Sequence, residues 1–142
     1  MKNLNTYINE AWSGVKQQSI KADIEAWCDE MNIRNYTINF KGEIDVNGGV
    51  DLSFRDFKEL PYKFGIVTGH FSLVCVKKLK SLKNCPDEIS GYFDVDNCSA
   101  LESLEGCPKE VDGNFYCRKC KRKFTKEEAK SLCKVKKENI FV

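Results

Sequence analysis

The chain has 142 residues, enough for one ordinary domain with a single core and too few for two independent ones. Its composition, with 42% hydrophobic and 31% charged residues, is globular and excludes a disordered or membrane-spanning chain. The formal net charge of +2 is uneven: residues 118–138 hold ten Lys or Arg against three Asp or Glu, a net +7, which leaves −5 on the remainder. This asymmetry is typical of a solvated cationic cap, and a nucleic-acid contact is the alternative.

The first twenty residues mix charged and amide side chains with apolar ones, so they lack the apolar core of a signal peptide. We therefore expect a cytoplasmic protein with no membrane partner. In that reducing compartment we expect the eight cysteines to stay reduced and to pack as small apolar groups.

Two segments near the start place apolar side chains at helical spacing. They are residues 4–15 (Leu4, Ile8, Ala11, Trp12, Val15) and residues 20–31 (Ile20, Ile24, Trp27, Met31). The pattern predicts two amphipathic helices, interrupted near Ser13-Gly14 and restarted with Ser19 as the N-cap. We expect the faces that carry Trp12 and Trp27 to cover the open end of the fold, and a partner-docking surface is the alternative.

From Tyr36 onward the pattern changes to the alternation that is typical of strands. Ile44 and Val46 alternate before the turn residues Asn47-Gly48-Gly49, and Val50 and Leu52 alternate after them. The sequence therefore predicts a small hairpin over residues 43–53.

The middle of the chain, residues 79–124, repeats itself at an offset of 22 residues. The pairs at this offset are Leu79/Leu101, Ser81/Ser103, Leu82/Leu104, Cys85/Cys107, Pro86/Pro108, Ile89/Val111, Gly91/Gly113, Phe93/Phe115 and Cys98/Cys120. A period of about 20 to 29 residues indicates a solenoid in which each coil buries its apolar face against its neighbours. An earlier, degenerate copy keeps the spacing with Phe54, Phe57, Leu60, Pro61 and Phe64, followed by three extra residues at 65–67.

Each coil contains one apolar-x-apolar segment that we predict to be a short strand of a parallel sheet. The inward residues would be Val50 and Leu52, Phe71 and Leu73, Phe93 and Val95, and Phe115 and Cys117. The glycine before each strand (Gly69, Gly91, Gly113) supplies either a positive φ or a close backbone contact between coils. The repeated proline stiffens the return segment outside the strand.

This unit resembles the leucine-rich repeat, L-x-x-L-x-L-x-x-N/C-x-L. The segments Phe93–Cys98 and Phe115–Cys120 carry the match, over about residues 50–124. The unit also resembles short C-P-x-x-V-x-G-x-F repeats of uncharacterised bacterial and phage proteins. The first resemblance implies a solenoid of stacked coils, and the second implies a small factor that binds and inhibits a host protein, for instance a defence enzyme.

The end of the chain carries a helix signal and then a strand signal. Thr125 and Glu128 form a capping box, which opens a helix with Ala129, Leu132 and Cys133 on one face. Residues 140–142 are apolar and predict a final strand that closes the stack. The expected organisation is one folding unit, with an N-terminal helical cap (1–38), a repeat solenoid (39–124) and a C-terminal cap (125–142).

The cysteines of the C-terminal half offer a weak alternative as zinc ligands. The set would be Cys98, Cys117, Cys120 and Cys133, around the single C-x-x-C pair. However, Cys117 occupies the repeat position of Leu73 and Val95, which favours a packing role. We therefore predict no cofactor and no metal.

No motif in the sequence predicts catalysis. His70 is the single histidine and has no triad-like partner near it in the sequence, and phosphate loops and zinc-protease motifs are absent from the 142 residues. The basic run Arg118–Lys123, flanked by Tyr116 and Phe124, is the basis of the nucleic-acid alternative.

The sequence as a whole predicts a non-catalytic protein-binding module of the α+β class. We expect a short leucine-rich-repeat-like solenoid of about four coils with parallel strands, an N-terminal helical cap and a C-terminal helix-strand cap. The outward residues of the strands form columns that differ between copies while the inward residues repeat, as a binding face on a constant scaffold would. The predicted partner-binding residues are His70, Ser72, Val74, Tyr92, Asp94, Asp96, Asn114, Tyr116 and Arg118, with Asp51 heading the central column.

Overall fold

The computed structural model describes residues 4–142, with side chains from residue 14 onward. The chain divides into two compact units, Met1–Asn32 and Ile33–Val142, which are described separately. Among the described residues, no helix is both long and apolar enough to cross a membrane.

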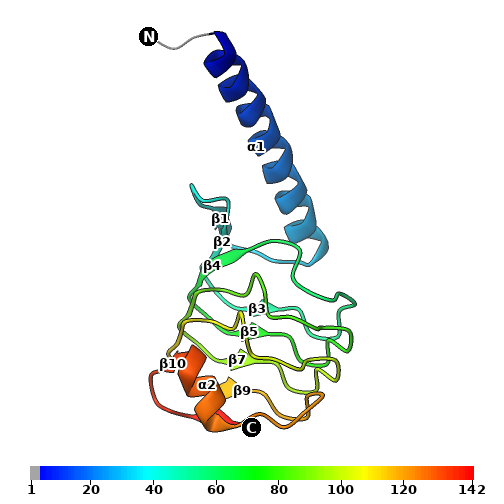
Figure 1. Ribbon diagram of the computed structural model, residues 1–142, viewed down its shortest axis with the longest axis vertical. Helices are drawn as coiled ribbons and strands as arrows, with labels where there is room; N and C mark the ends of the chain where they lie inside the picture. The colour runs from blue at the N-terminus through cyan, green and yellow to red at the C-terminus, as the bar shows by residue number, and fades with distance from the viewer. Residues whose placement is uncertain (1–3) are drawn as a thin grey trace. The chain divides into compact units, whose positions relative to one another are not determined.

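The first unit contains one continuous helix, α1 (Leu4–Glu30), which is the blue helix of Figure 1. The prediction of two helices is therefore wrong: Gly14 and Ser19 both lie inside α1. A single glycine costs a helix only about 1 kcal/mol, so it does not force a break. At 100° per residue, the apolar positions of 4–15 and of 20–31 lie roughly 150° apart around the axis, which is why they look like separate helices.

Where side chains are described, exposure changes along α1 and also within its second apolar stripe, which contains both Ile20 and Ile24. Ile24 and Cys28 are buried, whereas Val15 and Ile20 are exposed. The side chain of Trp12 lies outside the described residues. The expectation that this helix covers the open end of the solenoid stays a prediction.

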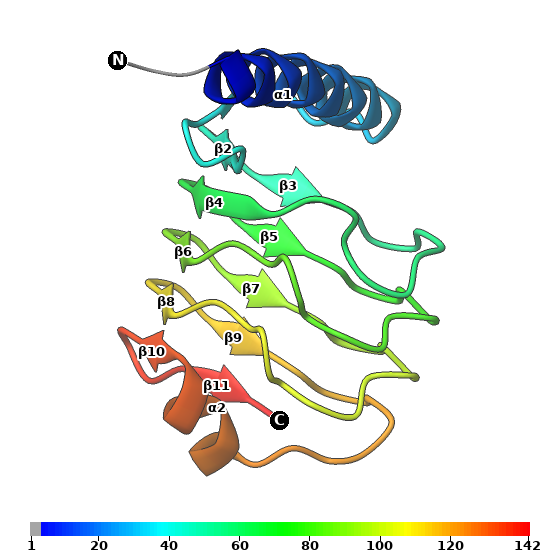
Figure 2. The same ribbon diagram turned by 45° about the horizontal axis from the view of Figure 1, so that its top comes forward.

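The second unit is a β-solenoid of about four turns built from two sheets (Figure 2). Sheet A has six strands, in the spatial order β1 (Tyr36–Ile38), β2 (Ile44–Val46), β4 (Phe64–Val67), β6 (Glu88–Ile89), β8 (Glu110–Val111) and β10 (Lys134–Val135). Sheet B has five strands, in the order β11 (Ile140–Phe141), β9 (Phe115–Tyr116), β7 (Phe93–Asp94), β5 (Phe71–Ser72) and β3 (Val50–Asp51). Every pairing is parallel except β1 with β2.

The predicted repeat is confirmed by the register of sheet B. Phe71 pairs with Phe93, and Phe93 pairs with Phe115. These rings are fully buried, with centroids 6.4 and 5.1 Å apart along the stack. The second inward position of each strand is also buried, through Leu52, Leu73, Val95 and Cys117. The coils therefore lie one above another with identical residues in contact.

Sheet A was not predicted. Its strands place Val67, Ile89 and Val111 in one buried row, directly before the repeated glycines. In these coils the inward residue is followed two positions later by a glycine and not by a second apolar residue, so the sequence shows no alternation there. Each coil thus contributes a strand to both sheets, and the core lies between them.

The predicted hairpin over 43–53 is wrong, because its two halves belong to different sheets. β2 instead forms a hairpin with β1, in which Ile38 faces Ile44 and Tyr36 faces Val46. The Asn47–Gly49 turn carries the chain from sheet A to sheet B, where Val50 pairs with Phe71. A turn at a solenoid corner has the same residue types as a hairpin turn, so the sequence did not separate the two.

The degenerate first copy also aligns differently from the prediction. Val67 pairs with Ile89 at the usual offset of 22, so the three extra residues at 65–67 are not an insertion. Phe54 is 77% exposed and does not occupy the position of buried Leu79. The apolar spacing placed this coil wrongly because exposed Phe54 fits the same sequence pattern as the buried leucines of the later coils.

Of the two roles predicted for the repeated glycines, the close backbone contact is the one observed. A Cβ on Gly91 would lie 2.7 Å from the carbonyl carbon of Gly69, and one on Gly113 would lie 2.6 Å from the carbonyl oxygen of Gly91. Positive φ occurs instead at a corner after β3, β5, β7 and β9, at Phe54, Cys75, Asn97 and Lys119. The glycine column therefore sets how closely the coils approach.

The C-terminal segment contains α2 (Lys126–Leu132), followed by β10 and β11. The predicted cap is present, since the backbone N–H of Glu128 donates to Oγ1 of Thr125 at 3.1 Å. Ala129 and Cys133 are buried, but Leu132 is 46% exposed, so its predicted place on the same face is wrong. Leu132 lies about 100° around the helix from the position of Cys133, in the last turn. The predicted final strand is β11, which pairs with β9.

Candidate partner-binding face

The outward residues of sheet B lie in three columns, which we call the sheet B face. In the central column, Asp51, Ser72, Asp94, Tyr116 and Phe141 are neighbours in register from coil to coil. Two residues before it stand His70, Tyr92 and Asn114, and two residues after it stand Val74, Asp96 and Arg118. The structure thus brings all the predicted partner-binding residues onto one face.

Four rings form a continuous row down this face. His70 stacks on Tyr92 with centroids 4.9 Å apart and planes within 14°. Tyr92 meets the ring of Tyr116 edge to face at 6.1 Å. Tyr116 in turn stacks on Phe141 at 4.9 Å. Because each ring packs against the next, the row presents mainly ring edges to a partner.

Phe141 belongs to this row but was missed in the sequence. It lies opposite Tyr116 at an offset of 25 residues, because α2 lengthens the last coil. It is 41% exposed, and Tyr92 is 39% exposed. The sequence does predict an apolar strand at the C-terminus. Adding that strand to the sheet in register with Phe115 and Tyr116 would have placed Phe141 in the row.

Gly49 makes room for the first ring of the row. A Cβ at this position would overlap the imidazole of His70. His70 is half-buried and packed between Gly49 and Tyr92. The contacts described for His70 are therefore those of a ring packed into the face.

Arg118 and Asp96 form a charge-assisted pair at one side of the face. Arg118 Nε donates to Asp96 Oδ2 at 2.9 Å, and the backbone N–H of Arg118 donates to Asp96 Oδ1 at 2.6 Å. The guanidinium also lies over the ring of Tyr116, 5.0 Å from its centroid. Asp96 is only 6% exposed, so this pairing compensates a carboxylate that has lost its water.

The two other aspartates of the face differ in their electrostatics. Hydrogen bonds from Ser53 lower the pKa of Asp51, whereas burial raises the pKa of Asp94. Ser72 lies between them in the central column, is 6% exposed, and shares a hydroxyl hydrogen bond with Ser53 at 2.9 Å. Ser72 and Asp96 therefore form the floor of the face rather than its contact surface.

The candidate zinc ligands are placed as packing and hydrogen-bonding groups. Cys98 Sγ donates to the carbonyl of Leu73 at 3.1 Å, and Cys120 Sγ donates to that of Val95 at 3.4 Å. Burial raises the pKa of Cys98, Cys117 and Cys133 to about 12 and that of Cys120 to about 11. In the part of the chain that is described, no three potential ligands gather around a common point. Cys98 and Cys120 thus link their coils to the preceding ones, and Cys117 and Cys133 are buried packing groups.

The basic run Arg118–Lys123 lines a hollow of about 400 Å³ next to the C-terminal residue. Three of its cations already have carboxylate partners: Arg118 pairs with Asp96, Lys121 with Glu102, and Arg122 with Glu128. The positive charge available to a phosphate backbone is therefore smaller than the sequence suggested.

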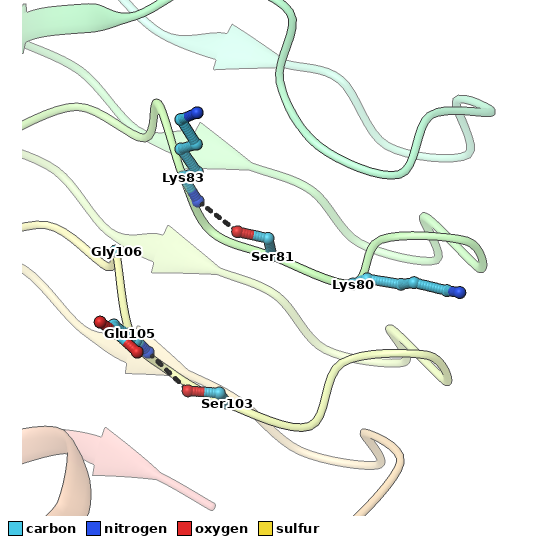
Figure 3. A pocket seen from close by; sticks show the side chains of 6 residues that line it. All are labelled: Lys80, Ser81, Lys83, Ser103, Glu105 and Gly106. Carbon is cyan, nitrogen blue, oxygen red and sulfur yellow. Dashed lines mark hydrogen bonds between the residues drawn. The ribbon is translucent and has the colours of Figure 1, made fainter.

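A second hollow, of about 350 Å³, lies where two successive coils turn (Figure 3). The hydroxyls of Ser81 and Ser103 accept the backbone N–H groups of Lys83 and Glu105, at 3.0 and 3.1 Å. The same local turn occurs in both coils, and Lys80, Lys83 and Glu105 also line the hollow. The serine hydroxyls that line this hollow are therefore hydrogen-bonded within the turns of the solenoid.

The opposite sheet offers a useful contrast. Its outward column contains Ile66, Glu88, Glu110 and Lys134 in register, without an aromatic row. Glu88 and Glu110 lie side by side on adjacent strands, as Ser72 and Asp94 do on sheet B. Sheet A thus supplies matched control positions for experiments on sheet B.

Comparison with protein-family models, curated proteins and solved structures finds no match to this chain.

Proposed function

We propose that the chain is a non-catalytic protein-binding module and that the sheet B face is its binding surface. One observation carries this proposal. The inward row of sheet B repeats phenylalanine from coil to coil, while the outward columns of the same strands vary and gather rings and charges. Aromatic side chains and arginine dominate the energetics of protein interfaces, and this face combines them on rigid strands.

The finer identity of the module is part of this proposal and rests on the sequence resemblance. A leucine-rich-repeat-like unit is supported by Cys98 and Cys120, which stand at the Asn/Cys position of that repeat and donate to carbonyls of the preceding coil. The resemblance to phage repeat proteins supports a small cytoplasmic factor that binds and inhibits a host protein.

The test is affinity capture with the full chain as bait, followed by mass spectrometry. The double variant Tyr92→Ala/Tyr116→Ala should lose the captured partner, because both side chains lie in the centre of the face. Phe40→Ala is the matched control, since Phe40 is a 96% exposed ring outside sheet B. Both variants should keep the native circular dichroism spectrum.

Two results would contradict the proposal. One is a partner held equally by the double variant and the native chain. The other is capture that survives the tyrosine substitutions and is lost with Lys121→Glu/Arg122→Glu, which would favour the basic run as the site. Nucleic acid recovered with the native chain and lost in that second variant would identify a nucleic-acid-binding protein instead.

A further inference from the structure

The hollow of about 400 Å³ that the basic run lines adjoins the sheet B face. Arg118 belongs to both, since it lines the hollow and lies over the rings of Tyr116 and Phe141, 5.0 and 5.9 Å from their centroids. Val142, the residue after Phe141, lines the hollow as well. A partner seated on the aromatic row therefore has this hollow directly beside it.

Three cations of the run form a fixed wall of the hollow. Arg118, Lys121 and Arg122 each pair with a carboxylate, those of Asp96, Glu102 and Glu128 respectively. Arg122 also donates from Nε to the carbonyl of Glu102 at 3.0 Å and lies over the ring of Phe124, 4.5 Å from its centroid. The charges of this wall are compensated within the chain.

Lys119 and Lys123 differ from the wall in their surroundings. Both line the hollow, and both are exposed. Among residues 14–142, the ion pairs of the chain include neither of these two ammonium groups. Two positive charges thus face the hollow without a carboxylate partner from the described chain.

This charge pattern matches a short acidic peptide segment better than a nucleic acid. Affinity for a phosphate backbone rises with the number of phosphates that are neutralised, and two lysines neutralise few. Two carboxylates of a peptide would complement the two ammonium groups. Phe141, which is 41% exposed, offers apolar ring surface next to the hollow, and phosphates make no use of it.

We propose that the partner of the sheet B face is a protein with an acidic segment, and that two carboxylates of this segment dock in the hollow against Lys119 and Lys123. This inference rests on the proposed function and names the chemistry of the partner. An apolar side chain beside the two acids packs against the exposed part of Phe141. Arg118, held by Asp96, stands where the hollow and the aromatic row meet and fixes their relative position.

Fluorescence anisotropy with a labelled synthetic peptide of alternating Gly and Glu tests this inference on the full chain. The variant Lys119→Gln/Lys123→Gln should weaken binding by at least about fivefold, because both unpaired ammonium groups are lost. The matched control is Lys134→Gln/Lys136→Gln, which removes the same charge from exposed positions in and just after β10 of sheet A. It should change binding by less than about twofold, because those lysines lie outside the hollow. A peptide with glutamine in place of glutamate should not bind.

Equal losses in both double variants would overturn the inference, because they would indicate unspecific attraction to a positive chain. Failure of the native chain to bind the glutamate peptide would overturn it as well, as would equal binding of the glutamine peptide. A single-stranded thymidine oligonucleotide that binds more tightly than the peptide, and is lost with Lys119→Gln/Lys123→Gln, would overturn it in favour of a nucleic-acid site.

These results leave the proposed function to its own test. A partner that is captured by the native chain and lost with Tyr92→Ala/Tyr116→Ala would still show that the face binds protein. Thermal unfolding of each variant checks that it folds.

Discussion

Single residues of the sheet B face affect stability, and under the proposed function they also contact the partner; these two requirements conflict at Asp94. Burial raises its pKa, so ionisation at neutral pH works against the folded state. Asp51 lies on the coil before Ser72, and its pKa changes in the opposite direction, because hydrogen bonds from Ser53 lower it. A carboxylate kept at a cost to stability is typical of a binding site.

The two aspartates therefore predict opposite pH effects on stability. The folded-state pKa of Asp94 is raised above 3.8, so its stabilising contribution is present below pH 3.8 and is lost as the pH rises through the folded-state value. The pKa of Asp51 is lowered below 3.8, so its contribution is present above pH 3.8 and is lost as the pH falls through the lowered value.

Asp94→Asn should thus raise the free energy of unfolding at pH 7, and Asp51→Asn should lower it, each by a small amount. The difference for Asp94→Asn should shrink towards pH 3, because the pKa of Asp94 is raised and its carboxylate is then largely protonated. The difference for Asp51→Asn should persist further into acid, because the pKa of Asp51 is lowered. Urea unfolding of the two variants and the native chain at both pH values measures this. If both variants changed the free energy of unfolding in the same direction at pH 7, the electrostatic description of the face would be contradicted.

At the scale of elements, glycine has one role in helix α1 and another in the coils of the solenoid. A Cβ at Gly14, inside α1, would meet no atom outside the local helix within 4 Å. A Cβ at Gly91 would meet backbone atoms of Gly69 and His70. Glycine is dispensable in the first element and required by coil spacing in the second.

Substitution by alanine should separate these roles. Gly14→Ala should stabilise α1 by up to about 1 kcal/mol, because alanine has the higher helix propensity. Gly91→Ala should destabilise the solenoid by about 1–3 kcal/mol, because the coils have to move apart. Circular dichroism at 222 nm and urea unfolding give the two values. A neutral Gly91→Ala would mean that the coils are more loosely packed than the structure indicates.

At the scale of the whole molecule, the sequence predicted best where residues stack on identical residues. Phe71, Phe93 and Phe115 repeat without a gap, so their register and the sheet B columns could be predicted together. Sheet A escaped prediction because Val67, Ile89 and Val111 are followed two positions later by glycine, so its repeated strands show no apolar alternation. Phe141 escaped prediction because α2 shifts the last coil by three residues. The prediction of a break in α1 was wrong, because one continuous helix can carry apolar stripes on two opposite faces.

The stack itself is the claim on which the binding face depends, since the columns exist only if the coils lie in register. Nuclear Overhauser contacts between aromatic ring protons test it most directly. Phe93 should show contacts to both Phe71 and Phe115, and Tyr116 should show contacts to both Tyr92 and Phe141. A folded protein in which Phe93 contacts neither phenylalanine would contradict the solenoid and, with it, the face proposed for binding.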